Sequence, residues 1–394
     1  MNATDFYPPP VVSQIQKRSL QIGIIGLAIS AIGGWLSPEQ FFRSYLIGYL
    51  FCIGVALGCL ALIMLHYLTG GTWGIVVRRL LESASRTLPL LALMFVPLIF
   101  GMHRLYIWTH PEAVQLVPLL QHKQPYLTVR FFLVRLAFYF AVWVLLESLL
   151  NRWGHQLDRV DDPRLSWRLK ALSGPGLVLY GFTISFAAVD WIMSLNPQWF
   201  STIFGMLVMV GQGLSALAFT ISIASLIAVR KPMSEVFTPR HFHDLGKLLL
   251  MFTMLWAYLA FSQFLLVWAG NLPSEIPFYL HRWKGGWQWV GLMLILFHFA
   301  VPFLLLLSRE VKRSVEWIAA VALLVIVMRF VDLFWLVQPE FSSEQFRIHW
   351  LNFVAPAGVG CIWLAAFAWQ LQKRALLPQS YLDHRETLAD QEAG

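Results

Sequence analysis

The chain has 394 residues, of which 58% are hydrophobic and only 13% are charged. A water-soluble domain carries about 25% charged residues, so most classes of soluble enzyme are excluded before any motif is considered. The net charge of +8 could indicate a nucleic-acid partner. The basic residues, however, gather in the loops on one side of the predicted membrane spans, so no nucleic acid is expected.

Ten apolar runs of the chain are each long enough to cross a bilayer, which takes about 20 residues. In the bilayer core every backbone N–H and C=O needs an internal partner, so these runs predict helices. We therefore expect an all-α polytopic membrane protein with ten transmembrane helices, surrounded by lipid. The predicted spans are 19–36, 41–69, 86–109, 127–150, 172–195, 199–229, 244–270, 285–308, 314–337 and 346–371.

The loops between these spans differ strongly in basic residues. With the N-terminus on the cytoplasmic side, inner segments hold twenty of the 29 Lys and Arg residues, outer segments hold five, and four lie within spans. Cytoplasmic loops carry such an excess, so the charge is topogenic and both termini are expected to be cytoplasmic. The first span follows Lys17 and Arg18 and lacks a small-residue cleavage site, which indicates a retained helix rather than a signal peptide.

An internal repeat is visible around the fifth and ninth spans. Segments 189–200 and 331–341 both begin Val-Asp and continue to an amide and a proline, with seven residues from Asp to Pro; a partial copy stands at 38–41. The three prolines precede spans two, six and ten, which gives a period of four helices. The alternative is that Asp-then-Pro is simply a common device at helix ends.

Duplication predicts two parallel four-helix bundles with two peripheral helices. The expected units are a cytoplasmic N-terminal arm (1–18), the first span (19–36), a first four-helix repeat unit (37–195), a second unit (196–337), the tenth span (338–371) and a cytoplasmic tail (372–394).

Ionisable residues within the spans are the candidate functional groups. A charge at bilayer depth costs several kcal/mol, so it usually faces the bundle interior and marks a site. Arg329 and Asp332 are three apart and can pair on one helix face. Asp190 needs a partner, which Arg104, Arg130 or Arg135 could supply. The candidates are His103, Arg104, Asp190, Arg329 and Asp332 towards the outer face, His66 and Glu147 towards the inner face, and His298 nearer the middle.

Two interpretations of these residues stay open. They could form a quinone headgroup pocket or a proton path, because a carboxylate with a buried neighbourhood can pass protons near neutral pH. They could instead be ion pairs that lock helices together, arginines that reach the interface, and a satisfied core histidine. The histidines do not form the two matched pairs of a membrane b-type cytochrome, so no haem is expected, and no metal-binding or phosphate-binding motif is present.

The segment 189–205, which begins Val-Asp-Trp-Ile-Met-Ser-Leu-Asn-Pro, resembles the NrfD-like membrane subunits. Together with segments 41–46 and 101–108, the ten spans and the four-helix period, it is most similar to the second, F-type subunit of bacterial alternative complex III. The resemblance covers spans one to ten. It implies a multi-pass subunit of the bacterial cytoplasmic (inner) membrane, in a respiratory or photosynthetic quinol:cytochrome c or cupredoxin oxidoreductase.

The same resemblance implies partners and a division of labour. The expected partners are an NrfD-like subunit with the quinol site, an iron–sulfur subunit, and multihaem and monohaem c-type cytochrome subunits. This chain would bind no redox cofactor covalently or by metal ligation; quinone or menaquinol is its candidate ligand. It would be a non-catalytic or quinone-binding subunit that moves protons between His66 and Glu147 inside and Asp190 and His103 outside, with His298 as an intermediate.

Other functional classes remain as alternatives. A stand-alone secondary transporter built from a parallel repeat would show broken helices at matching positions of both halves. A membrane enzyme acting on lipid would need a clustered catalytic set at one interface, and the sequence identifies none.

Overall fold

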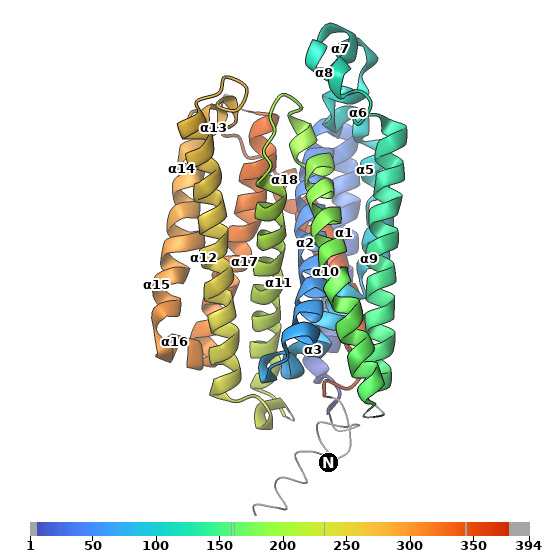
Figure 1. Cartoon of the computed structure of the whole chain (residues 1–394), viewed down its shortest axis with the longest axis vertical. Coiled ribbons are helices and arrows are strands. Elements are labelled where there is room, and N and C mark those ends of the chain that lie inside the picture. Colours follow the sequence, from blue (N-terminus) through green and yellow to red (C-terminus); the bar gives the residue numbers. More distant parts are fainter. Residues whose placement is uncertain (1–5, 159, 161, 232, 343–344, 378–394) are drawn as a thin grey trace, which may run out of the picture.

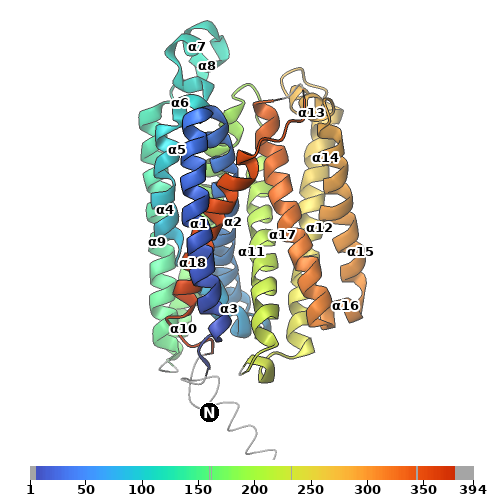
Figure 2. The same cartoon turned by 180° about the vertical axis from the view of Figure 1, so that it is seen from behind.

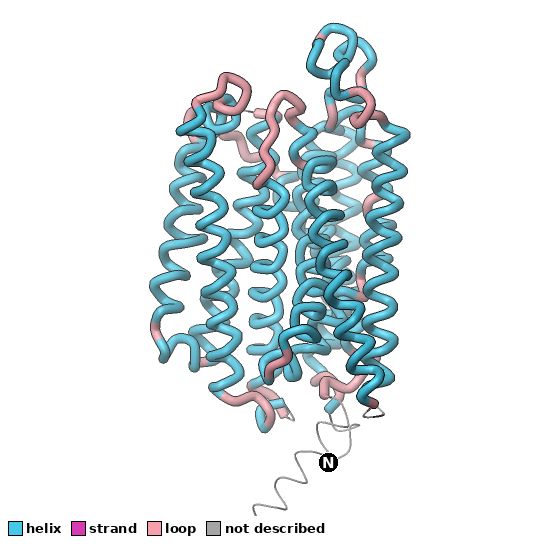
Figure 3. Tube along the Cα trace, in the orientation of Figure 1, coloured by secondary structure: helices cyan, strands magenta, loops and turns pink. Residues whose placement is uncertain are grey.

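The structure, a computed structural model, describes residues 6–158, 160, 162–231, 233–342 and 345–377. In this part of the chain the secondary structure is helical throughout, without strands (Figures 1 and 3). Ten helical segments are long and apolar enough to cross a membrane, which confirms the all-α class and the number of spans. They run side by side, with loops gathered at two ends. We call the end where α1 starts and α18 finishes the N end, and the opposite end the far end.

Each span is either one long helix or a group of consecutive shorter helices. They are α1 (Pro10–Leu36), α2 (Pro38–Thr69), the group α3 (Thr72–Ser85), α4 (Leu88–Met94) and α5 (Val96–Phe100), α9 (Val129–Leu157), α10 (Pro163–Trp191), α11 (Phe204–Ala228), α12 (Pro239–Gly270), the group α14 (Trp287–Met293), η5 (Leu294–Ala300) and α15 (Val301–Leu307), α17 (Val315–Val337) and α18 (Leu351–Leu371). Several of them begin at a proline. Proline fits the first helical position because the backbone N–H of that position makes no hydrogen bond within the helix, so its absence costs nothing.

Short helices cap the ends of the bundle. The far end carries α6 (Met102–Leu105), α7 (Pro111–Leu116), α8 (Pro118–Lys123) and α13 (Pro277–Arg282), and the N end carries α16 (Arg309–Arg313). The helices α7 and α8 stand out above the rest of the far end (Figure 1).

Several boundaries differ from those the sequence predicts. The first helix already begins at Pro10, so half of the expected arm 1–18 is helical; residues 1–5 lie outside the described residues, as does the tail from 378. The third span runs from Trp73 to Phe100 instead of covering 86–109. It breaks beside Pro89 and Pro97, because proline lacks the N–H that continues a helix.

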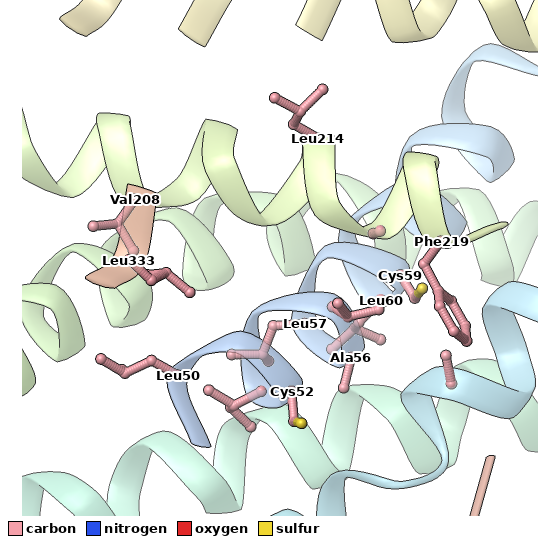
Figure 4. Close-up of a cluster of buried hydrophobic side chains, with 14 of the residues drawn as sticks. Leu50, Cys52, Ala56, Leu57, Cys59, Leu60, Val208, Leu214, Phe219 and Leu333 are labelled. Atoms are coloured by element: carbon pink, nitrogen blue, oxygen red, sulfur yellow. The ribbon is translucent and has the colours of Figure 1, made fainter. Parts of the chain in front are cut away.

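The helices α2 and α11 form the centre of the molecule. In the most apolar stretch of each helix, 89% of the α2 residues and 72% of the α11 residues are buried. The two helices pack on each other through small and aliphatic side chains (Figure 4). Around α2 lie α3, α4 and α10, with α9 against α4 and α10; α11 contacts α12 and α17, and α15 and η5 pack against both of those helices.

The first and last spans pack together at one side. α18 lies between α1 and α2 (Figure 2), so α1 is the more peripheral of the first and last spans: 28% of its apolar stretch is buried, against 56% for α18. A Cβ on Gly26 would lie 2.9 Å from the Cα of Gly358, so glycine lets the two backbones touch. Beyond the helices, the backbone N–H of Leu376 donates to the carbonyl of Phe6 at 2.8 Å.

Candidate functional site

Asp190 forms a buried ion pair with Arg135. The carboxylate, 1% exposed, accepts hydrogen bonds from Arg135 Nε at 2.9 Å, from Arg135 Nη2 at 2.8 Å and from the hydroxyl of Tyr139 at 2.8 Å. Arg135 Nη1 also donates to the carbonyl of Tyr126, whose ring lies against the guanidinium. Of the three arginines that the sequence offers as partners, the fold therefore selects Arg135.

The pair continues into a line of polar side chains along α9, which we call the α9 ladder: Arg135, Tyr139, Trp143, Glu147 and Asn151. Residues four apart are neighbours on a helix, and all five side chains are buried.

Side chains of neighbouring helices extend the α9 ladder. Trp143 Nε1 donates to the hydroxyl of Thr183 at 2.9 Å, and Asn151 Nδ2 donates to Glu147 Oε1 at 3.1 Å and towards Ser85 Oγ at 3.4 Å. The α9 ladder thus runs from Asp190 near the far end to Glu147 and Asn151 near the N end. Sequence reasoning missed Tyr139, Trp143 and Asn151, although their spacing of four could have pointed to them.

His66 lies at the N end, near the end of α2. Its ring packs against Gly74 and beside Trp73, and no described residue pairs with its Nδ1. The described hydrogen bonds do not join His66 to Glu147, so the two inner candidates share an end of the bundle but no direct contact.

A second buried group at the N end consists of Arg78, Arg79, Glu82 and Asp158, which we call the N-end ion cluster. Both arginines pair with Asp158, and Arg79 Nη1 donates to Glu82 Oε2 at 2.6 Å. Arg79 Nε also donates to the carbonyl of Ala375 at 3.0 Å. The loop count treats Arg78 and Arg79 only as charges that set the topology. In the fold they also link α3, α9 and the segment after α18.

The helix α17 carries another buried ion pair. Arg329 and Asp332 bind each other as their spacing predicts, and both are at most 3% exposed. Trp256 Nε1 donates to Asp332 at 3.2 Å, and the Trp256 ring meets His298 edge to face at 4.3 Å. His298 is fully buried in η5, a π-helical turn, and no described residue pairs with either ring nitrogen. π-turns frequently occur at functional sites.

Gly211 makes room for the Arg329 side chain. A Cβ at this position would overlap the guanidinium, so any larger residue would force Arg329 to shift.

At the far end, one basic residue from each long loop binds the backbone after the repeated aspartate. Lys123 Nζ donates to the carbonyl of Pro197 at 2.6 Å. Arg282, fully buried, donates to the carbonyls of Trp335 at 3.1 Å and Leu336 at 2.8 Å and pairs with Glu340 at 2.8 Å. Burial lowers the pKa of the Arg282 guanidinium, and Glu340 offsets part of that shift.

The turn after α10 also contacts α13. The Trp199 ring stacks on Phe278 with centroids 4.1 Å apart and an angle of 14° between the planes, which joins the turn after α10 to α13.

The remaining outer candidates stand apart from Asp190. His103 and Arg104 are exposed on α6, beyond the membrane span, and Arg130 is exposed on α9. The carbonyl of His103 lies 2.7 Å from His110 Nε2.

A cleft of ≈ 490 Å3 opens beside α7 and α8 at the far end. Trp108, Gln121, Gln124, Leu127 and Thr128 are among its lining residues, which makes it an uncharged surface with amide and hydroxyl groups. Its volume falls within the range of small-molecule sites, about 300–1,000 Å3.

Across the described ranges, no group of three or more His, Cys, Asp or Glu side chains could hold a metal ion. The chain matches no protein-family model and no curated protein.

Proposed function

We propose that this protein is an NrfD-like, F-type subunit of an alternative complex III-like quinol oxidoreductase, and that it contributes a proton path. The observation that carries the proposal is the α9 ladder, a buried line of polar side chains between Glu147 and Asp190. Carboxylic acids and hydroxyl groups exchange protons when they lie within hydrogen-bond reach of each other or of a bridging water. Glu147 and Tyr139 of the ladder supply a carboxylic acid and a hydroxyl, and their neighbours Asp190 and Thr183 on α10 supply one more of each.

The proposed organisation is two parallel four-helix units, α2 to α10 and α11 to α17. Two features support it. Asp190 and Asp332 occupy equivalent helices, and each sits in a buried ion pair. Lys123 and Arg282 come from equivalent loops, and each binds carbonyls of the segment that follows the repeated aspartate.

In this proposal the N end faces the cytoplasm of a bacterial cell, in line with its basic residues. Protons would enter near Glu147 and His66 and reach Asp190. The second unit, with His298, Asp332 and Arg329, would hold a second set of groups.

A quinone is the candidate ligand of the far-end cleft. Quinone carbonyls accept hydrogen bonds, and the amides of Gln121 and Gln124 and the indole of Trp108 are donors. Trp108 Nε1 is buried, and no described residue accepts its hydrogen.

The transporter alternative is less well supported. It requires helix breaks at matching positions of both units. The third span is interrupted between α3, α4 and α5, whereas its equivalent, α12, is continuous from Pro239 to Gly270.

Purification of the tagged protein from its native membrane in mild detergent tests the proposal. We expect co-purifying subunits that carry c-type haem, seen by absorbance, and iron–sulfur clusters, seen by electron paramagnetic resonance. A protein that purifies alone, without such partners, would contradict it.

A further inference from the structure

A small cavity lies between the two units, where α2 and α10 meet α11 and α17. Its volume is ≈ 20 Å3. One water molecule needs about 10–15 Å3, so the cavity fits a single water and is too small for a quinone ring.

Two residues that line this cavity each carry a buried hydrogen-bond donor that no other described residue pairs with. Trp191 Nε1, from α10, and Arg329 Nε, from α17, are both buried, and no described residue accepts a hydrogen bond from either. A buried donor without an acceptor is destabilising, so two at one cavity point to a ligand that accepts both.

The cavity also offers two acceptors. Gln212 Oε1 accepts from the hydroxyl of Tyr180 at 2.8 Å and keeps a second lone pair. Ser215 donates its own hydrogen to the carbonyl of Gly211 at 2.7 Å, so its oxygen is left to accept. Gln212 and Ser215 both line the cavity.

We propose that this cavity binds one ordered water molecule. The water accepts hydrogen bonds from Trp191 Nε1 and Arg329 Nε and donates to Gln212 Oε1 and Ser215 Oγ. This use of both hydrogens and both lone pairs is what buried waters require. A cation fits this site poorly because it would face two N–H donors. An anion also fits poorly, because it would face two acceptor oxygens and because the charge of Arg329 is already neutralised by Asp332.

The position of the water gives it a role. Trp191 follows Asp190 in the chain, and Arg329 pairs with Asp332. The water therefore connects a residue next to the Asp190 ion pair with a member of the Asp332 ion pair, across the boundary between the units. This role as a link in proton transfer rests on the proposed function; the water site itself does not.

Gly54→Ala tests the site because Gly54 lines the cavity. The added Cβ would lie 3.5 Å from Cγ of Gln212, an ordinary contact. The matched control is Gly360→Ala in α18, where a Cβ meets nothing within 4 Å. Both variants exchange a helical glycine for alanine, which favours the helix equally.

We expect Gly54→Ala to have a lower melting temperature than Gly360→Ala, because the methyl group displaces the water and leaves the two donors unpaired. If Gly54→Ala melts at the same or a higher temperature, the cavity is dry and the proposal is overturned. The second measurement is a density map of the unaltered protein at a resolution that shows waters. A peak within hydrogen-bond distance of Arg329 Nε supports the site, and an empty cavity overturns it.

Neither measurement depends on partner subunits. A protein that purified alone would contradict the proposed function and leave the water site standing, whereas a dry cavity would remove the site and leave the proposed function untouched.

Discussion

Arg135 donates hydrogen bonds to the carboxylate of Asp190 from Nε at 2.9 Å and from Nη2 at 2.8 Å, at the contact between α9 and α10. The geometry is two-pronged, which gives such pairs directional specificity. Both side chains are buried, so each one neutralises the charge of the other in a place where an unpaired charge would be costly.

The first prediction concerns this pair. Removing one partner of a buried ion pair costs about 3–5 kcal/mol, because it strands the other charge. We expect Asp190→Ala and Arg135→Ala each to lower the free energy of unfolding by about that amount, and the double variant to lose clearly less than the sum. Denaturation in mild detergent measures all three. Arg130→Ala, at an exposed position of the same helix, is the control, and additive losses would show that the pair is not coupled.

The second prediction concerns proton transfer. In Asp190→Asn the amide oxygen can still accept a hydrogen bond from Arg135, so the proposed complex should assemble at some cost in stability, but the side chain can no longer release a proton. We expect proton release or quinol turnover to fall by about 10²-fold, the lower end of a general acid–base contribution. Asp244→Asn, at an N-end position paired with Lys247, should leave both unchanged. Normal turnover and proton release in Asp190→Asn would count against the path.

The sequence predicts the ten spans because their signal is local: each apolar run is long enough to cross a bilayer by itself. It predicts the Arg329–Asp332 pair for the same reason, since three residues of spacing place both side chains on one helix face. The breaks beside Pro89 and Pro97, and the π-helical turn at His298, depend instead on packing around them and leave weaker local signals.

Partners from different helices are the part that the sequence does not determine. It offers three arginines to Asp190, and tertiary packing decides among them. It also treats Arg282 as an outer loop charge, although the fold buries it against carbonyls after α17. A count of loop charges measures topology and carries no information on which of those charges are buried.

The third prediction concerns Gly211. Gly211→Ala would place a methyl group where the Arg329 guanidinium lies. Overpacking of this kind costs about 1–3 kcal/mol, and we expect a loss of stability in that range. Gly360→Ala, which meets no neighbour, should gain up to about 1 kcal/mol from its higher helix propensity. Equal unfolding midpoints for the two variants would mean that Arg329 does not need this space.

The fourth prediction concerns the far end. Arg282→Ala would strand Glu340 and free the carbonyls of Trp335 and Leu336. We expect faster backbone hydrogen exchange in residues 336–342, measured by mass spectrometry, together with a loss of about 3–5 kcal/mol. Lys284→Ala, at an exposed position two residues later, is the control. Unchanged exchange in Arg282→Ala would show that the segment is held by other contacts.

The contact of α1 with α18 has a consequence for biogenesis. Chains emerge from the ribosome N-terminus first, so α1 is made well before α18, the helix against which it mainly packs. Until α18 is complete, the Gly26 surface of α1 has no Gly358 to pack against. Docking of this pair therefore waits for the synthesis of α18, and a chain truncated before α18 should leave α1 loosely attached and open to quality-control proteases.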